Sequence, residues 1–433
     1  MKLLVKGGRV VDPANGRDGE LDVLIENGRI ARVGRDIPVN GADVFRVRSG
    51  WIVAPGFIDI HVHLREPGQE HKETVATGTA AAVAGGFTSV ACMPNTDPIN
   101  DHPGISELIL RKAAEAQLAR VYPIGAVSVG SRGEQLAELG AQKAAGCVAF
   151  SDDGRPVASA LLMRRALEYG GMLNVPIIDH CEDPSLKGDG VAHEGFRAAA
   201  LGLRGIPGIA ESIMVERDIA LAELTGAPFH VAHMSARQSL RAVRDAKTRG
   251  ARVTSEVTPH HLVLTDDALE EPIRYDTNVK MNPPLRERQD RDAMVEGLAD
   301  GTIDVIATDH APHHADEKLV EFDRAPFGIV GLETAVPLVF DRLVHTGRIG
   351  IRRIVELLSV NPARVLNLPG GSLTEGHAAD LTILAPDART TIAAARLRSK
   401  SKNTPFDGWI LRGAVAATLV AGRVVYTNED LAS

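Results

Sequence analysis

One stretch of the sequence decides what the rest of the chain must be: Gly56-Phe57-Ile58-Asp59-Ile60-His61-Val62-His63-Leu64-Arg65-Glu66-Pro67-Gly68. It starts as an apolar run of strand-forming residues and ends with two histidines two positions apart, followed by an arginine. Because alternate side chains of a strand point to the same side, His61 and His63 are expected to project together. Two imidazoles at this spacing can hold a metal ion. We favour this interpretation over the alternative, in which they are simply half-buried histidines on an amphipathic strand.

After this stretch the sequence alternates between strand and helix patterns up to about residue 365. Apolar, β-rich runs predict eight strands: Phe57–His63, Phe87–Met93, Val121–Val127, Cys147–Phe150, Pro176–Asp179, Pro228–Ala232, Val253–Val257 and Thr302–Ala307. The segments between them predict helices, among them Thr74–Ala84, Ile105–Leu118, Ser159–Tyr169, Ile209–Leu224 and Ser239–Arg249. Eight such alternations favour an α/β fold with a (β/α)8 TIM-type barrel, and a doubly wound parallel sheet is the alternative.

Both ends of the chain are predicted to be β-rich instead. Short strand-like runs precede residue 54, and Asn27-Gly28 between two of them is a strong hairpin signal. Further runs, such as Asp380–Leu384 and Ala417–Val420, follow residue 366. Short hairpins are marginal alone, so the two ends are expected to pair into one small β-sandwich-like domain. The predicted organisation is a composite β domain of residues 1–54 plus 366–433 and a barrel of residues 55–365.

The overall composition excludes several classes of protein. The 433 residues carry 48 basic and 56 acidic side chains with no basic block, which argues against nucleic acid as a partner. No apolar run is long enough to span a bilayer, and the first residues do not resemble a secretory signal. Three cysteines, an odd number, lie in or beside apolar runs and predict buried reduced thiols: Cys92, Cys147 and Cys181. We therefore expect a cytoplasmic protein with no membrane partner.

Polar residues recur at the carboxyl ends of the predicted strands, which is where barrel active sites form. They are His61, His63, Asn95, Asp152, Asp153, His180, His233, Asp309, His310 and His313. Four histidines and two carboxylates exceed the ligands of one tetrahedral zinc, so the set suits two metal ions that share a bridging carboxylate and a bridging hydroxide. Such a hydroxide is a nucleophile, and Asp309 can pass its proton to a departing nitrogen. Mixed histidine and carboxylate ligands favour zinc.

The sequence resembles the dihydroorotases of the bacterial class I type, within the amidohydrolase superfamily. The resemblance covers essentially the whole chain, and five motifs make it specific. They are Asp59-Ile60-His61-Val62-His63-Leu64-Arg65-Glu66-Pro67-Gly68, Met93-Pro94-Asn95-Thr96, Phe150-Ser151-Asp152-Asp153-Gly154, Val279-Lys280-Met281-Asn282-Pro283-Pro284-Leu285-Arg286 and Ala307-Thr308-Asp309-His310-Ala311-Pro312-His313, the last closed by Lys318.

The resemblance implies a reaction and a role for each site residue. The reaction is the reversible cyclisation of N-carbamoyl-L-aspartate to (S)-dihydroorotate plus water, in pyrimidine synthesis. The implied ligands of two zinc ions are His61, His63, Asp153, His180, His233 and Asp309, with Asp309 also the catalytic acid and base. Many amidohydrolases bridge their metals with a carboxylated lysine, whereas this strand end offers only Asp152 and Asp153, of which we favour Asp153. The implied substrate contacts are His63, Arg65, Asn95, Asn282, His313, Phe327 and Gly328.

Two other functions fit parts of the pattern. Hydantoinases and allantoinases share the paired histidines and the late aspartate, but Asn95, His313 and the missing lysine weigh against them. The other alternative is an inactive scaffold for aspartate transcarbamoylase, although every expected metal ligand is present here. A homo-oligomer is expected, and association with aspartate transcarbamoylase is compatible with an active enzyme.

Overall fold

In the computed structural model, which describes residues 2–431, eight parallel strands stand in one sheet in the same order as in the chain. They are β8 (Phe57–Val62), β9 (Phe87–Cys92), β10 (Arg120–Gly125), β11 (Ala149–Phe150), β12 (Ile177–Asp179), β15 (Phe229–Val231), β16 (Val253–Val257) and β17 (Val305–Ile306). Beyond β17 the chain meets β8 again, because the His63 N–H donates to the His310 carbonyl at 2.9 Å. The sheet therefore curls into a nearly closed barrel, and the prediction of a (β/α)8 fold is confirmed.

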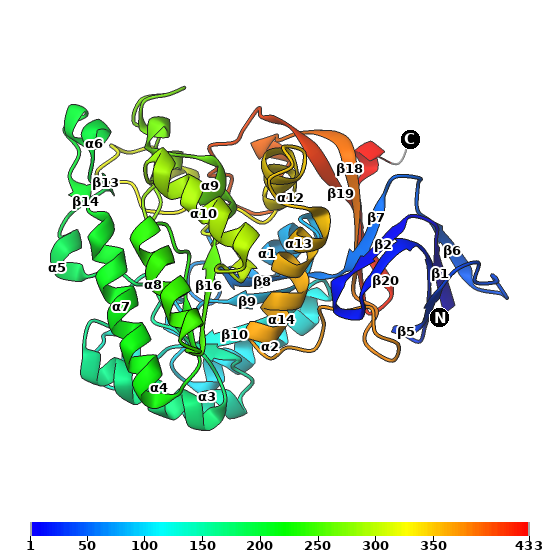
Figure 1. The fold of residues 1–433 in the computed structure, drawn as a ribbon, viewed down its shortest axis with the longest axis horizontal. Coiled ribbons are helices and arrows are strands. Elements are labelled where there is room, and N and C mark those ends of the chain that lie inside the picture. The colour runs from blue at the N-terminus through cyan, green and yellow to red at the C-terminus, as the bar shows by residue number, and fades with distance from the viewer. Residues whose placement is uncertain (1, 432–433) are drawn as a thin grey trace.

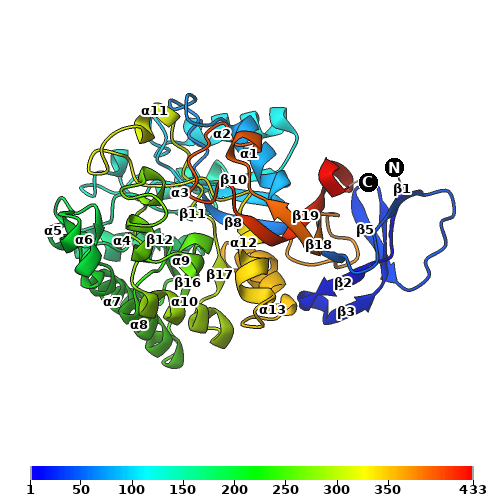
Figure 2. The same ribbon diagram turned by 90° about the horizontal axis from the view of Figure 1, so that it is seen from above.

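Helices cover the outside of the barrel (Figures 1 and 2). The longer ones are α1 (Val75–Ala84), α2 (Pro103–Ala116), α4 (Ala160–Leu173), α7 (Gly208–Thr225), α8 (Arg237–Thr248) and α10 (Arg288–Asp300). Shorter ones are α3 (Leu139–Ala144), α5 (Pro184–Lys187), α6 (Phe196–Ala200), α9 (Pro259–Val263), α11 (Ala315–Lys318), α12 (Ala335–Val339), α13 (Ile351–Val355) and α14 (Asn361–Val365). Local signals start some of them: Thr74 caps α1 and Ser159 caps α4 with their hydroxyls. None of the helices in residues 2–431 has the length and hydrophobicity that crossing a membrane requires.

Strands from both ends of the chain share one six-stranded sheet in the order β20-β19-β18-β7-β2-β3. Its members are β2 (Arg9–Asp12), β3 (Arg17–Glu20), β7 (Ile52–Pro55), β18 (Leu381–Thr391), β19 (Ile410–Val420) and β20 (Arg423–Thr427). A second sheet contains β1 (Lys2–Lys6), β4 (Asp22–Glu26), β5 (Arg29–Gly34) and β6 (Asp43–Arg46). Glu26 pairs with Arg29, so Asn27-Gly28 is the two-residue hairpin loop that the sequence predicted.

The six-stranded sheet lies between the barrel and the four-stranded sheet (Figure 2). Neighbouring residues on its strands pack in opposite directions, as the period of two requires. Val11 and Leu384 belong to the apolar core of the barrel, whereas Val10 and Ile383 pack against β1 and β4. The sheet thus anchors the terminal strands to the barrel.

One segment of the C-terminal region reaches the site face of the barrel, although no pattern in the sequence predicted it. Asn403 donates its amide hydrogens to the carbonyls of Ala311 and Gly328, both at 3.1 Å, and accepts the His313 N–H at 3.1 Å. Ser399 donates to buried Glu73. The loop between β18 and β19 therefore supports the loops that follow β17. The cysteines agree with their prediction, since all three are buried and free.

Candidate metal centre and active site

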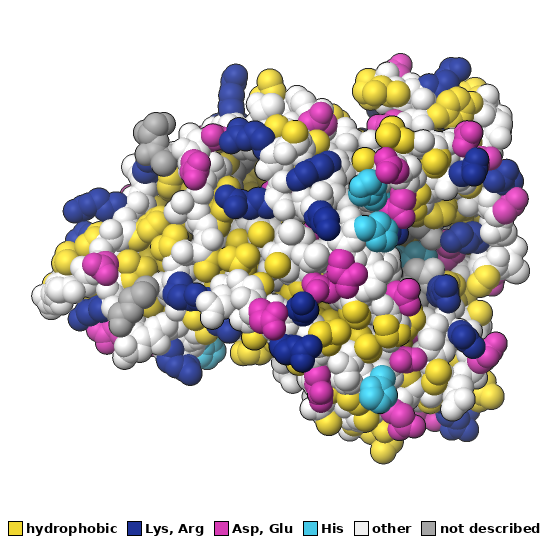
Figure 3. Space-filling view, turned by 180° about the vertical axis from the view of Figure 1, so that it is seen from behind, with side chains coloured by type: hydrophobic (Ala, Val, Ile, Leu, Met, Phe, Trp, Pro, Cys, Tyr) yellow, Lys and Arg dark blue, Asp and Glu magenta, His cyan; other side chains and the backbone are white. Residues whose placement is uncertain are grey.

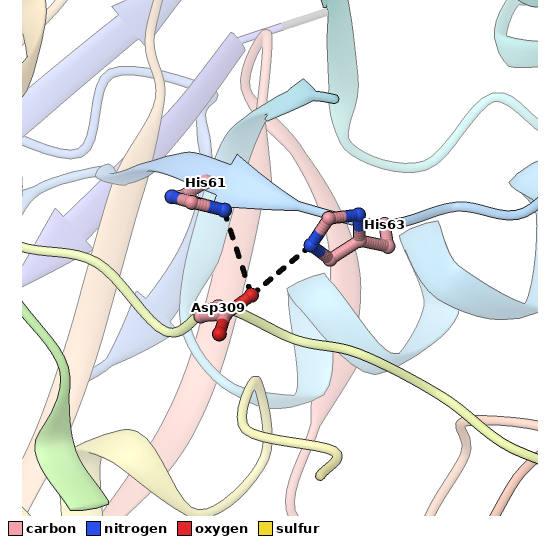
Figure 4. Close-up of side chains that lie close together, drawn as sticks. All are labelled: His61, His63 and Asp309. Atoms are coloured by element: carbon pink, nitrogen blue, oxygen red, sulfur yellow. Dashed lines mark hydrogen bonds and ion pairs between the residues drawn. The ribbon is translucent and has the colours of Figure 1, made fainter. Parts of the chain in front are cut away.

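The first half of the metal cluster comes from the stretch that opened the chain. His61 lies on β8 and His63 directly after it, and both rings turn toward the carboxylate of Asp309 beyond β17 (Figure 4). The Asp309 Oδ1 atom lies 3.0 Å from His63 Nε2 and 3.5 Å from His61 Nε2. These three buried side chains can hold one metal ion.

The second half comes from the ends of β11, β12 and β15. Asp153 Oδ1 lies 3.5 Å from His61 Nε2, 3.7 Å from His180 Nδ1 and 3.4 Å from His233 Nε2. Its other oxygen lies 3.5 Å from His63 Nε2. Asp153 therefore stands between the two pairs of histidines, which is the position that a bridging carboxylate needs.

The residues fit a metal centre because their inward atoms lack other partners. His61 Nε2 and Asp153 Oδ1 are buried without a hydrogen bond, and a buried unpaired polar atom is costly. The His180 Nδ1 and His233 Nε2 atoms lie 2.9 Å apart, within hydrogen-bond distance, so these two ring nitrogens are close together. Burial lowers the pKa of His61, but Asp153 and Glu256 outweigh burial and raise that pKa well above its usual value. Negative charge thus surrounds the point where a cation would sit.

Carboxylate and amide groups behind the cluster fix its histidines. Glu256, on β16, accepts from His61 Nδ1 at 2.6 Å and from the His233 N–H at 3.2 Å. The Asn95 oxygen accepts from His63 Nδ1 at 2.8 Å. With Nδ1 carrying the proton in His61 and His63, Nε2 of each ring is free to bind a metal ion.

The backbone is strained at three site residues. Arg65, His233 and Asp309 have positive φ angles of 62°, 28° and 48°. Residues other than glycine rarely adopt positive φ angles, and such backbone strain concentrates at functional sites. Tertiary contacts therefore hold these three side chains toward the cavity against the preference of their own backbone.

The two neighbouring aspartates after β11 have different surroundings. Asp152 accepts the N–H groups of Val127 at 2.9 Å and Ser128 at 3.1 Å, and it also accepts the Ser128 hydroxyl. These bonds use both of its oxygens to shape the loop after β10. Asp153 instead faces the histidines with one oxygen unpaired. The geometry favours Asp153 over Asp152 as the bridge.

A cavity of about 350 Å³ opens over the cluster. It is lined by His63, Arg65, Asn95, Asp153, Gly154, His180, Lys187, His233, Asn282, Asp309, Ala311, His313, Pro326, Phe327 and Gly328. Every residue that the sequence nominated for metal or substrate lies in this lining except His61, which is fully buried beneath it.

Arg65 places a buried positive charge in the lining of this cavity. Only 7% of the residue is exposed, and its guanidinium donates to the Pro312 carbonyl at 3.2 Å and lies 3.5 Å from His313 Nε2. Among the described residues no carboxylate lies within ion-pair distance of this guanidinium. Burial lowers the pKa of Arg65 to about 10, so the group stays charged at neutral pH. A buried cation without a counter-ion suits an anionic ligand.

The other residues predicted to contact the substrate are held in place by hydrogen bonds and close packing within the protein. The Asn282 amide nitrogen donates to Glu182 and lies at the same distance, 3.1 Å, from His180 Nε2, while the Asn282 oxygen has no hydrogen bond. His313 Nε2 donates to the Phe327 carbonyl at 2.8 Å. Gly328 has a φ of +119°, and a Cβ there would lie 2.6 Å from the Ala311 Cβ, so only glycine fits.

Sequence reasoning missed three residues of this site. Glu256 and Glu182 are buried carboxylates that orient the cluster histidines and Asn282, and Lys187 of α5 ion-pairs with Glu182 at 2.7 Å. The signal for Glu256 was a charged residue inside an apolar strand, Val253–Val257. Glu182 lies in the loop before α5 and Lys187 at the end of that short helix, and neither is marked by a sequence pattern. Two other buried histidines of this end of the barrel bond elsewhere: His310 to Glu73 and His261 to the Pro283 carbonyl.

The fold and the cluster together define an amidohydrolase. The Amidohydrolase family model matches residues 329–426, and the Dihydro-orotase-like model matches residues 50–239. Solved structures agree on the fold: L-hydantoinase from Arthrobacter aurescens has a TM-score of 0.86 at 25% identity, covering 98% of this chain and 96% of its own. Dihydropyrimidinase from Brevibacillus agri has a TM-score of 0.85 at 24% identity, with 99% and 96% covered.

Relatives with similar sequences identify a more specific family than the solved structures do. A protein of Syntrophotalea carbinolica named dihydroorotase is 54% identical over 99% of this chain and 100% of its own length. Another so named, from Anaeromyxobacter dehalogenans, is 57% identical over 98% of both chains. The chain belongs to the dihydroorotase family, as the motifs around His61 and Asp309 had indicated.

Proposed function

We propose that this chain is a dihydroorotase, which interconverts N-carbamoyl-L-aspartate with (S)-dihydroorotate plus water in pyrimidine synthesis. The observation that carries the proposal is the unpaired, buried Arg65 beside the metal cluster. Dihydroorotate has a carboxylate on its ring, and a planar guanidinium can bind that group at two points. Relatives with the same name at 54–57% identity over nearly the full length support this assignment.

Two zinc ions are the proposed cofactors. His61, His63 and Asp309 would hold one ion and His180 and His233 the other, with Asp153 shared between them. The unpaired atoms of His61 and Asp153 support this division. When bound, the ions would lower the pKa of a water at the centre and polarise the carbonyl group under attack.

The remaining chemistry falls to Asp309. In the hydrolytic direction, the water oxygen bonds to the ring carbonyl carbon, and the bond from that carbon to the ring nitrogen breaks. Asp309 would take the proton of the water on a carboxylate oxygen and return it to the departing nitrogen. Ring closure runs through the same transfers in reverse.

The wall residues would orient the ring. Arg65 would bind the carboxylate, and the Asn95 amide N–H groups are free to help because its oxygen already accepts from His63. The unpaired Asn282 oxygen would accept a ring N–H. His313, Phe327 and Gly328 would close the far side of the cavity.

The rival enzymes differ at the carboxylate. The hydantoinases that share this fold are named for rings that carry no carboxylate, and a buried arginine would gain nothing from them. An inactive scaffold is disfavoured because all six candidate ligands are present and lie together around the carboxylates of Asp153 and Asp309.

The test is a substrate comparison with the zinc-loaded enzyme. Dihydroorotate is compared with 5,6-dihydrouracil, which is the same ring without the carboxylate, and with hydantoin and allantoin. We expect kcat/KM for dihydroorotate to exceed that for dihydrouracil by about 1,000-fold or more, since a buried charge left unpaired discriminates strongly. Equal or better turnover of the rings without a carboxylate would overturn the proposal. Protein that neither retains zinc nor gains activity with added zinc would support the scaffold.

Three further predictions belong to this proposal: a cytoplasmic location, a homo-oligomer, and association with aspartate transcarbamoylase. Light scattering of the purified chain, alone and mixed with the transcarbamoylase of the same organism, checks the last two.

A further inference from the structure

The segment 319–328 brings Phe327 and Gly328 to the cavity, but it has no regular structure of its own. It follows α11, and none of its residues lies in a helix or strand. Leu319 is 80% exposed, whereas Phe322 is buried in an apolar cluster with Val279 and Met281. Something other than backbone pairing must therefore fix the position of its inner end.

Lys318 bonds to the inner end of the segment. Its ammonium group, on a residue only 6% exposed, donates to the Pro326 carbonyl at 2.7 Å and to the Thr277 carbonyl at 3.0 Å. The Thr277 hydroxyl donates in return to the Lys318 carbonyl at 2.6 Å. One lysine thus ties the residue before Phe327 to the 3-10 turn Thr277–Val279.

Lys280 bonds to the middle of the segment and to its end. Its ammonium donates to the Phe322 carbonyl at 2.7 Å and to the Asp323 carbonyl at 3.0 Å. It also lies 4.7 Å from the centre of the Phe327 ring, within the range of a cation–π contact. The Lys280 carbonyl accepts the Gly328 N–H at 2.9 Å.

These two lysines lack the carboxylate partners that buried lysines usually have. Among residues 2–431, neither has an acidic group within ion-pair distance, and Asp276, Glu317 and Asp323 act only from further away. Burial lowers the pKa of Lys280 to about 8 and of Lys318 to about 7. A neutral amine still has two N–H groups, enough for the two carbonyls that each lysine serves. Burying such groups is costly, so their retention indicates a role in those bonds.

We infer that Lys280 and Lys318 are positioning residues that hold the segment 319–328 against the substrate cavity. This inference rests on the proposed function, and it assigns to the two lysines the role of holding one side of the substrate cavity in place. The effect reaches Arg65 through one further contact, because His313 donates to the Phe327 carbonyl and lies beside the guanidinium. Release of the segment would therefore displace the wall opposite the metals while the metal ligands stay in place.

The competing explanation is that the Phe322 side chain alone anchors the segment. Variants that keep the stem but remove the donors separate the two: Lys280→Met and Lys318→Met. Lys318→Arg restores N–H donors at one position. Lys247→Met is the control at the amino-terminal end of the barrel, where the half-buried Lys247 donates to the Gly301 carbonyl and forms an ion pair with Asp304.

The experiment combines hydrogen exchange with steady-state kinetics on the full-length, zinc-loaded enzyme. We expect the amides of residues 319–328 to exchange at least about tenfold faster in both methionine variants, with residues 57–63 and the zinc content unchanged. KM for dihydroorotate should rise about tenfold with kcat within about threefold, and Lys318→Arg should recover at least half of the loss.

The outcomes separate this inference from the proposed function. Unchanged exchange in the segment, or an unchanged KM in both methionine variants, would overturn the inference. So would equally faster exchange throughout the barrel, because the lysines would then act only on overall stability. If the wild-type enzyme does not turn over dihydroorotate, the proposed function fails, but the exchange measurements still decide whether the lysines hold the segment.

Discussion

The floor and the wall of the active site are built in different ways. The floor is the metal cluster, where His61, Asp153 and His233 extend from the carboxyl ends of barrel strands and have ligand atoms within 4.8 Å of one another. The wall includes Asn282, His313 and the segment 319–328, which lie on loops and are held by side-chain hydrogen bonds: from Asn282 to Glu182, from His313 to Asn403, and from Lys280 and Lys318 to the segment.

This difference separates two properties of the enzyme. The sheet fixes the floor, because neighbouring parallel strands place their ends side by side whatever the loops do. The wall depends on contacts far apart in sequence, such as the bonds from Asn403 to the carbonyls of Ala311 and Gly328. Changes in the floor should therefore affect metal binding and kcat, and changes in the wall should affect KM and specificity. On the face that Figure 3 shows, basic and acidic side chains are interspersed.

The strongest test of the floor is Asp309→Ala. Loss of the group that moves the proton should reduce kcat by about 100- to 10,000-fold. Circular dichroism should show an intact fold, because the side chain lies at the cavity and supports no element. Asp309→Asn keeps the shape and should be nearly as inactive. If either variant keeps near-normal kcat, the role of Asp309 in proton transfer is wrong.

The matching test of the wall is Arg65→Met. Losing a two-point contact to the carboxylate should cost about 2–4 kcal/mol, or ~30- to 1,000-fold in kcat/KM for dihydroorotate. Most of this loss should appear in KM. The slow hydrolysis of dihydrouracil serves as the control and should change little. An equal loss for both substrates would mean that Arg65 acts on the floor and not on the carboxylate.

Glu256→Gln examines how the floor is supported. The substitution keeps a hydrogen-bond acceptor for His61 Nδ1 but removes the charge. Zinc affinity, measured by competition with a chelator, should fall by about 10- to 100-fold. His230→Gln is a useful comparison, because His230 also bonds to Glu256 but lies away from the cavity lining. Unchanged zinc affinity in Glu256→Gln would remove Glu256 from the metal centre.

The smallest expected effect is a pH dependence of stability at the wall. Burial lowers the pKa of Lys318 to about 7 in the folded chain, against the ordinary value of 10.5. Between these values the unfolded chain holds a proton that the folded chain has released, so the free energy of unfolding rises with pH through this window. Relative to Lys318→Met, the wild type should gain about 1 kcal/mol, or ~1 °C in Tm, from pH 7 to pH 9. A flat or falling difference would contradict the buried state of Lys318.

Much of the floor could be predicted from the sequence. His61 and His63 alternate on one strand, and the other candidate ligands each follow an apolar run, so the spacing alone brought them to one end of a barrel. The choice between Asp152 and Asp153 was harder, because a shift of one residue reverses which side chain faces inward. The structure distinguishes the two aspartates, because the N–H groups of Val127 and Ser128 donate to the Asp152 carboxylate.

The sequence by itself therefore determined the strands, their helices, the hairpin at Asn27-Gly28 and the side chains able to bind metal, because these follow from periodicity and residue chemistry over short distances. Only the tertiary structure decided which polar groups lack a partner. Among the described residues, Arg65, Lys280 and Lys318 have no carboxylate within ion-pair distance, and the inward atoms of His61 and Asp153 have no hydrogen bond. A missing partner is a property of everything around a group. It depends on residues far along the chain: Asn403 lies 75 positions from Gly328, and Glu256 lies 195 positions from His61.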